Sequence, residues 1–329
     1  MNTVPTQSFA RHIAISTSST QRNLLLSRAS RPVAHIAILI LLCVGCSFAS
    51  AHIAARISFD HGTGLLTAVV FRSGISLLLL ALIALWQKQS LRIRWSIAPW
   101  QILLGLLIAI QSICIYSAVT RIPVGIALLT ANTFPAQLAL LSWALGGKPP
   151  SRKASVLMGV ILIGLLLALD IPSLIEAGTD HLYIWLTGIA FALTAAFSFS
   201  IGLWVTENKL KHLKGSARSF YTMLTVLITT FTAGHLGVMP GGLSWPESGT
   251  GWGTLILLSS LYALAFITLF MLAPRLNLAQ NAPAMNIEPV ASLTLGWIIL
   301  GQQLSTMQII GGALVVSCIV AFAYAKDER

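Results

Sequence analysis

The feature that most constrains this chain is a series of long apolar runs that fill nearly the whole sequence. A helix needs about 20 apolar residues to cross the hydrocarbon core of a bilayer, and such runs recur ten times in the 329 residues. Their hydropathy is continuous rather than alternating, which favours helices over the strands of a membrane barrel. The seventh run is the weakest, because it is rich in threonine and contains His235. The sequence predicts an all-α integral membrane protein with ten transmembrane helices, near residues 33–53, 64–86, 98–119, 122–146, 154–172, 182–206, 217–239, 252–273, 276–300 and 304–325.

The composition argues against the main alternative classes. Only 9% of the residues are charged and 56% are hydrophobic, whereas soluble proteins carry roughly 25% charged residues. A soluble enzyme could not cover its surface with so few charges. The net charge of +11 would suggest nucleic-acid binding in a soluble protein. Here, however, the basic residues lie in short gaps between apolar runs, so we expect no nucleic-acid partner.

The charges in the gaps predict how the chain is oriented. Cytoplasmic loops of inner membrane proteins collect Lys and Arg, and alternate gaps carry them as Lys88, Arg92 and Arg94, then Lys148, Arg152 and Lys153, then Lys209, Lys211 and Lys214, then Arg275. The intervening gaps carry acids, with Arg56 and Arg121 as exceptions: Asp60, Asp170, Glu176, Asp180 and Glu247. We expect a multi-pass protein of the plasma membrane, specifically a bacterial inner membrane, with both termini cytoplasmic. The gap at residues 302–303 has no charge, so the final helix is placed by count alone.

Residues 1–31 differ from everything that follows. They contain four arginines, no acid and many Ser and Thr residues. That composition is typical of a transit peptide, and it equally fits a disordered cytoplasmic tail beside an anionic membrane surface. We favour the tail, because the loop charges already place the N-terminus inside.

The two halves of the chain resemble each other. Three pairs of residues are separated by the same 154 positions: Arg121 with Arg275, Pro135 with Pro289, and Gly147 with Gly301. Five helices per half is an odd number, so the second half is expected to lie upside down relative to the first. We assign the repeats to residues 32–173 and 181–326. Inverted repeats of this kind are the architecture of many secondary transporters, whose binding site lies near the midplane between the halves.

The matching prolines predict breaks in two helices. A proline inside a helix removes one backbone hydrogen bond and frees a carbonyl one turn earlier, here on Ala131 for Pro135 and on Met285 for Pro289. Broken backbone at membrane depth is tolerated where protein or a water-filled cavity satisfies it. A plain packing kink is the alternative. We favour residues that line a cavity, because the two prolines occupy matching positions.

A resemblance to a known family accompanies these features. The run Met285-Asn286-Ile287-Glu288-Pro289-Val290, followed by Gly301 and a helix with Gly311-Gly312, resembles the second repeat of EamA-type transporters of the drug/metabolite transporter superfamily. The segment around Pro135 resembles the first repeat, and Arg72 after Phe71 resembles an arginine often found in the second helix of that family. The resemblance covers about residues 33–325. It implies ten helices, export of small metabolites and a central cavity between the repeats.

The chain departs from the family pattern at two loop positions. The family commonly has Gly-Glu at the ends of the fourth and ninth helices, whereas this chain has Gly147-Lys148 and Gly301-Gln302. A role for that glutamate is therefore in doubt in this protein.

Two charged residues, Arg72 and Glu288, lie well inside apolar runs. A charge near the bilayer centre costs about 2.5–3.5 kcal/mol on insertion scales, so it is normally functional or paired. Glu288 is expected midway along the ninth helix, where it could exchange protons or bind a substrate ammonium, or form a structural pair with Arg72. Arg72 could attract a substrate carboxylate, or its side chain could extend to the outer membrane interface.

Neutral polar residues complete the candidate substrate and coupling site. Asn132 and Asn286 are the strongest of these, because they stand at matching positions three residues before the two prolines. Singly, such residues more often join helices than bind ligands. The other candidates that we select are Gln111, Tyr116 and Tyr262.

These observations predict a secondary transporter. It would export a small polar or amphipathic metabolite by alternating access, with amino acids and related zwitterions as the leading substrates and with proton antiport left open. The partners expected are a small-molecule substrate and membrane lipid, and a homodimer is one arrangement that the sequence allows. No Walker A or zinc-protease motif occurs, and we expect no catalytic residue, no cofactor and no metal. A non-transporting membrane assembly partner and a membrane enzyme are the alternatives.

Overall fold

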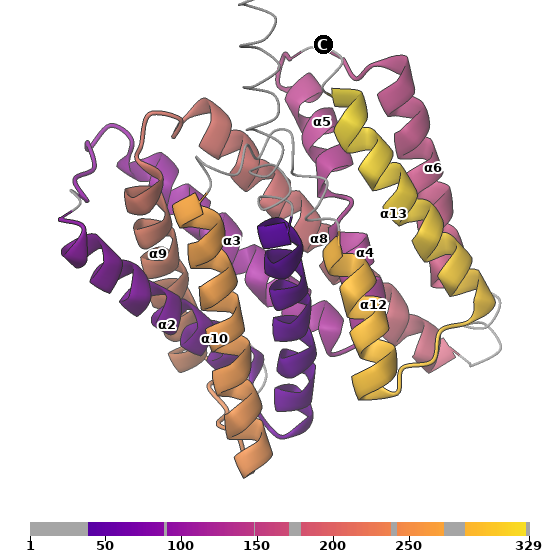
Figure 1. The fold of residues 1–329 in the computed structure, drawn as a ribbon, viewed down its shortest axis with the longest axis horizontal. Helices are drawn as coiled ribbons and strands as arrows, with labels where there is room; N and C mark the ends of the chain where they lie inside the picture. Colours follow the sequence, from indigo (N-terminus) through magenta and orange to yellow (C-terminus); the bar gives the residue numbers. More distant parts are fainter. Residues whose placement is uncertain are drawn as a thin grey trace, which may run out of the picture.

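The computed structural model describes residues 39–88, 91–147, 149–170, 179–237, 242–272 and 287–326, and these residues form helices and their connections with no strand among them (Figure 1). The predicted tail at residues 1–31 lies outside the described residues. In chain order the helices are Leu39–Asp60, α2 Leu65–Trp86, α3 Ala98–Val119, α4 Val124–Ala131, α5 Phe134–Ala144, α6 Arg152–Leu169, α8 Thr179–Asn208, α9 Gly215–His235, α10 Gly249–Leu272, α12 Ile287–Leu300 and α13 Thr306–Lys326.

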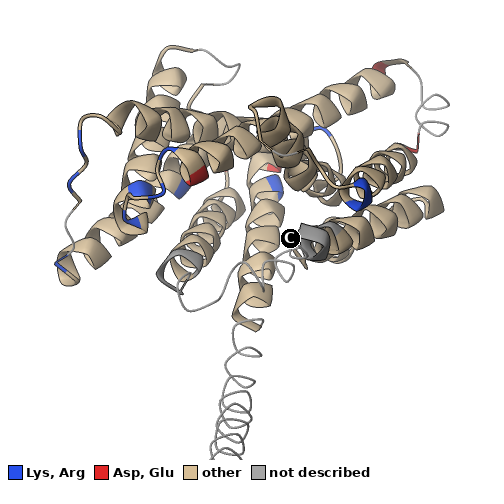
Figure 2. Cartoon of the chain, turned by 90° about the horizontal axis from the view of Figure 1, so that it is seen from above, with Lys and Arg blue, Asp and Glu red and all other residues tan. Residues whose placement is uncertain are grey.

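Helices occur in all ten apolar runs, and six helical segments are long and apolar enough to cross a membrane, with α4 and α5 counted as one segment. The protein is therefore an all-α membrane protein. Helix α9, which lies in the run predicted to be weakest, is not among the six. Helices α6, α12 and α13 are not among the six either. In Figure 2 most of the helical ribbon carries no charge, and the basic residues gather near helix ends and in loops.

The first helix extends past its predicted end at residue 53 and reaches Asp60. Two contacts explain how a charged residue is accommodated in this last part. The Arg56 guanidinium pairs with Asp60 one turn further on, at 3.2 Å. It also donates a hydrogen bond to the carbonyl of Val119 at 2.7 Å. The charge that suggested an end to the helix is therefore compensated locally.

Hydrogen bonds link to one another the loops that the charge pattern assigns to the outer side of the membrane. The backbone N–H groups of Gly64 and Glu247 donate to the carbonyls of Ser244 at 2.9 Å and His61 at 3.1 Å. The side chain of Gln302 accepts a hydrogen bond from the N–H of Val124 at 3.2 Å. The uncharged connection after α12 thus lies beside the start of α4, at the same end of the bundle as the other connections of this set.

Helices of the first half of the chain pack against helices of the second half. Helix α2 packs against α9 and α10, α3 against α8 and α9, and α4 against α12. Helices α6 and α13 lie side by side at one edge of the molecule (Figure 1). One apolar core, which includes the buried residues Val69, Ile115, Leu129 and Val315, runs between these layers.

Glycines let α6 and α13 approach until their backbones touch. A Cβ atom added to Gly311 would collide with the backbone of Ala168, and it would lie 2.5 Å from the carbonyl oxygen of Gly164. A Cβ atom on Gly164 would lie 2.8 Å from the side chain of Val315. Small residues at helix interfaces are the usual means of close approach in membranes.

Glycines follow both α5 and α12, but the one with left-handed backbone stands one position earlier after α5 than the match of Gly147 with Gly301 suggests. After α12 the residue with left-handed backbone is Gly301, with φ +63°. After α5 it is Gly146, with φ +89°, rather than Gly147. The N–H of Gly147 donates to the carbonyl of Ser142 at 2.9 Å, which is how a glycine-terminated helix satisfies its last carbonyls.

Candidate substrate-binding site

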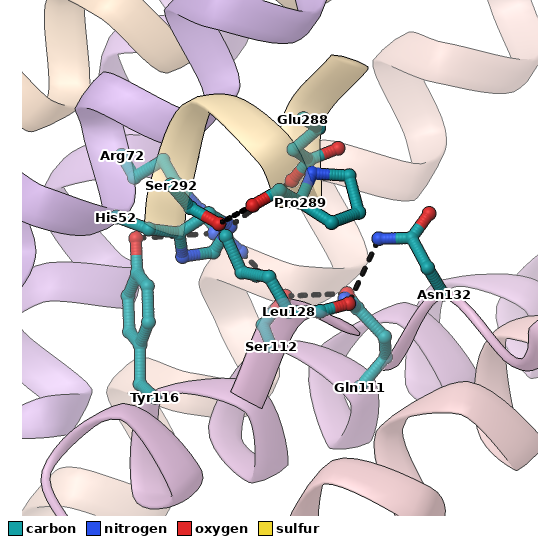
Figure 3. A network of polar contacts seen from close by, with 10 residues as sticks. All are labelled: His52, Arg72, Gln111, Ser112, Tyr116, Leu128, Asn132, Glu288, Pro289 and Ser292. Carbon is teal, nitrogen blue, oxygen red and sulfur yellow. Dashed lines mark hydrogen bonds and ion pairs between the residues drawn. The ribbon is translucent and has the colours of Figure 1, made fainter. Parts of the chain in front are cut away.

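Arg72 is buried at the centre of a polar and aromatic cluster (Figure 3). It lies on α2, and its side chain donates to the hydroxyls of Tyr116 at 3.1 Å and Ser112 at 2.5 Å, both on α3. Its guanidinium carbon lies 4.0 Å from the ring centre of Tyr262 on α10 and 4.9 Å from that of Tyr116. With only 3% of its surface exposed, the Arg72 side chain is directed into the bundle rather than along its surface. This favours the interpretation in which Arg72 faces a ligand.

The partners of the Arg72 guanidinium are neutral. Within the part of the chain that the structure describes, Glu288 pairs with His52 and not with Arg72, so the structural pair of Arg72 with Glu288 is not formed. The Nε atom of Arg72 is buried and has no hydrogen-bond partner. A buried cation without a counter-ion is costly, and this arrangement leaves the guanidinium able to bind an anion.

Glu288 lies opposite a histidine that the sequence analysis did not select. The Oε1 atom of Glu288 is 3.8 Å from the Nε2 atom of His52, and their side chains are 19% and 9% exposed. The other ring nitrogen of His52, Nδ1, is buried without a partner, and the ring lies edge-on to Tyr116 at 5.7 Å. The sequence offered a signal for this residue, because a histidine inside an apolar run is as unusual as Arg72 or Glu288.

Helix α12 is described only from Ile287, so Glu288 lies in its first described turn. The expectation that this acid sits midway along a helix from residue 276 depends on residues 276–286, which lie outside the described residues, as do Met285 and the candidate Asn286. Pro289 is buried, and its carbonyl accepts a hydrogen bond from Ser292 at 2.7 Å.

The fourth apolar run is interrupted immediately before Pro135. Helix α4 ends at Ala131, two residues are non-helical, and α5 begins at Phe134 with Pro135 in its first turn. Because proline has no N–H, the carbonyl of Ala131 lacks its usual helical donor. The side-chain amide of Asn132 turns back to the carbonyl of Leu128 at 2.9 Å. The apolar run at residues 122–146 thus holds two helices, with the break before Pro135 that the sequence predicts, and the side chain of Asn132 adds a second hydrogen bond to a carbonyl that already accepts the backbone N–H of Asn132.

The remaining candidates lie at the edges of the cluster. The side-chain oxygen of Gln111 is 3.4 Å from the hydroxyl of Ser112, which also donates to a backbone carbonyl at 2.7 Å. Tyr262 contacts the ring of Phe48 at 5.4 Å. Asn132 lies on the other side of Glu288 from Arg72 in the view of Figure 3. Across the described residues, no group of three or more His, Cys, Asp and Glu could hold a metal ion.

Comparison with known proteins gives this cluster a context. The model described as the EamA-like transporter family matches the chain twice, over residues 35–169 and 186–324. A curated protein of Synechocystis, named as an uncharacterized transporter, is 28% identical over 225 residues. That alignment covers 68% of this chain and 65% of the relative, so the chain spans about two thirds of the relative's length.

A solved crystal structure supports the arrangement of the helices. It is 20% identical in sequence, superposes with a TM-score of 0.58, and the match covers 89% of this chain and 99% of that chain. At this identity the likeness concerns the fold alone.

Proposed function

The chain belongs to the EamA-like transporter family, and we propose that it is a secondary transporter that exports a small polar or amphipathic metabolite by alternating access. Amino acids and related zwitterions are the leading substrate class. The proposed protein crosses the plasma membrane of a bacterium ten times, with both termini in the cytoplasm. Its two inverted repeats comprise residues 32–173 and 181–326.

The helix contacts support the proposed inverted repeat. If each helix of the first half corresponds to one in the second, α2 corresponds to α9, α3 to α10, the α4–α5 segment to α12, and α6 to α13. The contact of α2 with α10 then corresponds to that of α9 with α3, and both occur. The contacts of α2 with α9, α4 with α12, and α6 with α13 each correspond to themselves. These matched contacts support a two-fold axis between the halves.

The observation that carries the proposal is that the buried Arg72 and His52 and the partly buried Glu288 bring groups of both charge signs together at the junction of the halves. His52 and Arg72 come from the first half, and Tyr262 and Glu288 come from the second. A zwitterion could place its carboxylate against Arg72 and its ammonium against Glu288. Because the site is built from both halves, a rocking motion of one half against the other would expose it to each side in turn.

Transport into proteoliposomes tests this function. The full chain is reconstituted, a mixture of amino acids and small metabolites is offered with an imposed pH gradient, and the accumulated compounds are identified by mass spectrometry. Wild type, Glu288→Gln and the control Glu207→Gln, whose carboxyl is exposed at the end of α8, are compared. We expect accumulation by wild type and the control, and its loss in Glu288→Gln. No accumulation by any folded variant would contradict the proposal and favour a membrane assembly partner.

A further inference from the structure

The central cluster holds three ionisable groups of different character. The guanidinium of Arg72 is permanently positive. Glu288 can be negative or neutral, and His52 can be neutral or positive, so the His52–Glu288 pair can gain a proton while Arg72 cannot lose one. Arg72 and His52 are each more than nine-tenths buried, and the cluster therefore cannot rely on bulk water to compensate an added charge.

Both of these buried side chains also have an unused polar atom. The Nε atom of Arg72 and the Nδ1 atom of His52 make no hydrogen bond within the described residues. Buried nitrogen atoms are almost always satisfied in folded proteins, and the exceptions call for an explanation such as a bound ligand. Two such atoms within one cluster indicate a site whose partners lie outside the described residues, as a bound ligand would.

We propose that this cluster binds a carboxylate at Arg72 only when one positive charge is added at the His52–Glu288 pair. That charge is either an ammonium group of the same ligand or a proton from solution. The proposal rests on the proposed function, because it assigns the ligand chemistry of the same site. It adds His52 as a specificity-determining residue, and it states what accompanies each class of ligand.

The charge balance carries the argument. In the proposed empty state Glu288 is ionised and His52 is neutral, so the positive charge of Arg72 and the negative charge of Glu288 cancel. A ligand carboxylate adds one negative charge, which a dry site tolerates only with a compensating cation. The ammonium of a zwitterion supplies that cation directly. A carboxylate without an ammonium leaves the excess negative charge in place until one proton binds between the His52 ring and the Glu288 carboxyl, whose nearest atoms are 3.8 Å apart.

Among the described residues, no further acid or histidine faces the pair. The nearest groups that could carry charge are the guanidinium of Arg72, which holds its proton, and the phenols of Tyr116 and Tyr262 beside it. Arg56, one turn along the helix from His52, is already paired with Asp60. Helix α4 has no ionisable residue, and Glu288 is the one acid or base of α12 as described.

Two ligands with the same carbon skeleton test the proposal. Alanine carries an ammonium group and propionate does not, so only propionate should bring a proton with it. Binding of each radiolabelled compound to the purified full-length protein is measured by equilibrium dialysis. Proton uptake is measured in parallel with a pH indicator in weakly buffered solution. We expect both compounds to bind, propionate with uptake of about one proton per site and alanine with none.

Two variants and their controls locate the proton. Glu288→Gln and His52→Gln should each abolish the proton uptake that accompanies propionate. Glu207→Gln and His212→Asn, which change exposed residues of the same types, should preserve it. Gel filtration and thermal unfolding establish which variants are folded, and two independent site variants keep the test valid if one of them misfolds.

The outcomes separate this inference from the proposed function. Equal proton uptake with both ligands, retention of uptake in both folded site variants, or failure of wild type to bind either compound would overturn the charge-balanced site. Transport of metabolites in proteoliposomes under any of those results would leave the transporter intact. Proton-linked binding without flux would support the site and contradict the transporter.

Discussion

The two halves of the molecule meet in two very different ways. Helices α6 and α13 join through Gly164 and Gly311, whose close contacts are with Ala168 and Val315, so that backbone lies against backbone. At the central cluster the halves join through Arg72, His52 and Glu288, with buried nitrogen atoms that lack partners. The first contact is complete without a ligand, and the second is not. We infer that the contact of α6 with α13, which we call the edge, stabilises the fold and serves as its scaffold. The cluster around Arg72, which we call the centre, is less stable than it could be because it is built to bind a ligand.

Arg72→Gln should give the largest effect and tests this contrast directly. Loss of one partner of a buried charge contact costs about 2–5 kcal/mol, so we expect transport in proteoliposomes to fall roughly 30-fold or more. Because an uncompensated buried ion is itself destabilising, the thermal unfolding temperature should stay the same or rise. The exposed Arg152→Gln serves as control. A lower unfolding temperature in Arg72→Gln would instead make the centre part of the scaffold.

Gly311→Ala should show the opposite behaviour at the edge. The new methyl group would overlap the backbone of Ala168, and overpacking of this kind costs about 1–3 kcal/mol. The variant should unfold at a lower temperature, while the molecules that remain folded bind ligand as wild type does. Gly159→Ala on α6 is the matched control, because a Cβ atom at that position meets no neighbour within 4 Å. Equal stability of the two variants would refute the tight contact.

Ser112→Ala should produce a smaller effect at the centre. The Ser112 hydroxyl accepts a hydrogen bond from the Arg72 guanidinium at 2.5 Å, and a bond to a charged group contributes about 1.5–3 kcal/mol. We expect ligand affinity, measured by equilibrium dialysis, to fall by roughly tenfold or more. Ser117→Ala on the same helix is the control, because the Ser117 hydroxyl is buried without a partner. If both variants bind equally well, Ser112 does not orient the guanidinium.

The sequence predicted what depends on hydropathy and on single unusual residues. It located the apolar runs in which helices occur. It also selected Arg72, Tyr116 and Tyr262, which the structure brings into one cluster, and Glu288, which pairs with His52 beside that cluster. It did not select His52, because a histidine that is neutral at pH 7 does not stand out from the other neutral polar residues of the runs without its partner Glu288 in view. It also could not give the partner of each charge, since that depends on how helices distant in the sequence pack.

The two loop positions that depart from the family pattern illustrate the same limit. The sequence showed that Gln302 stands where the family commonly has glutamate, but it did not show what this side chain contacts. In the structure its oxygen accepts a hydrogen bond from the N–H of Val124 at 3.2 Å, at the start of α4. A residue from the connection after α12 therefore caps a helix of the other half, which is a third place where the halves meet.

Gln302→Ala should give the smallest effect, and it decides whether this third contact belongs with the edge or with the centre. Loss of a helix cap costs about 1 kcal/mol, so we expect a modest fall in unfolding temperature with ligand affinity unchanged. Gln302→Glu keeps the acceptor and adds a negative charge at a helix N-terminus, which is favourable there, and it should match or exceed wild type in stability. The exposed neighbour Gln303 provides the control Gln303→Ala. A hydrogen bond between the halves that breaks during transport would affect the transport rate more than the stability of the fold. If Gln302→Ala alters transport at unchanged stability, the contact therefore belongs with the centre.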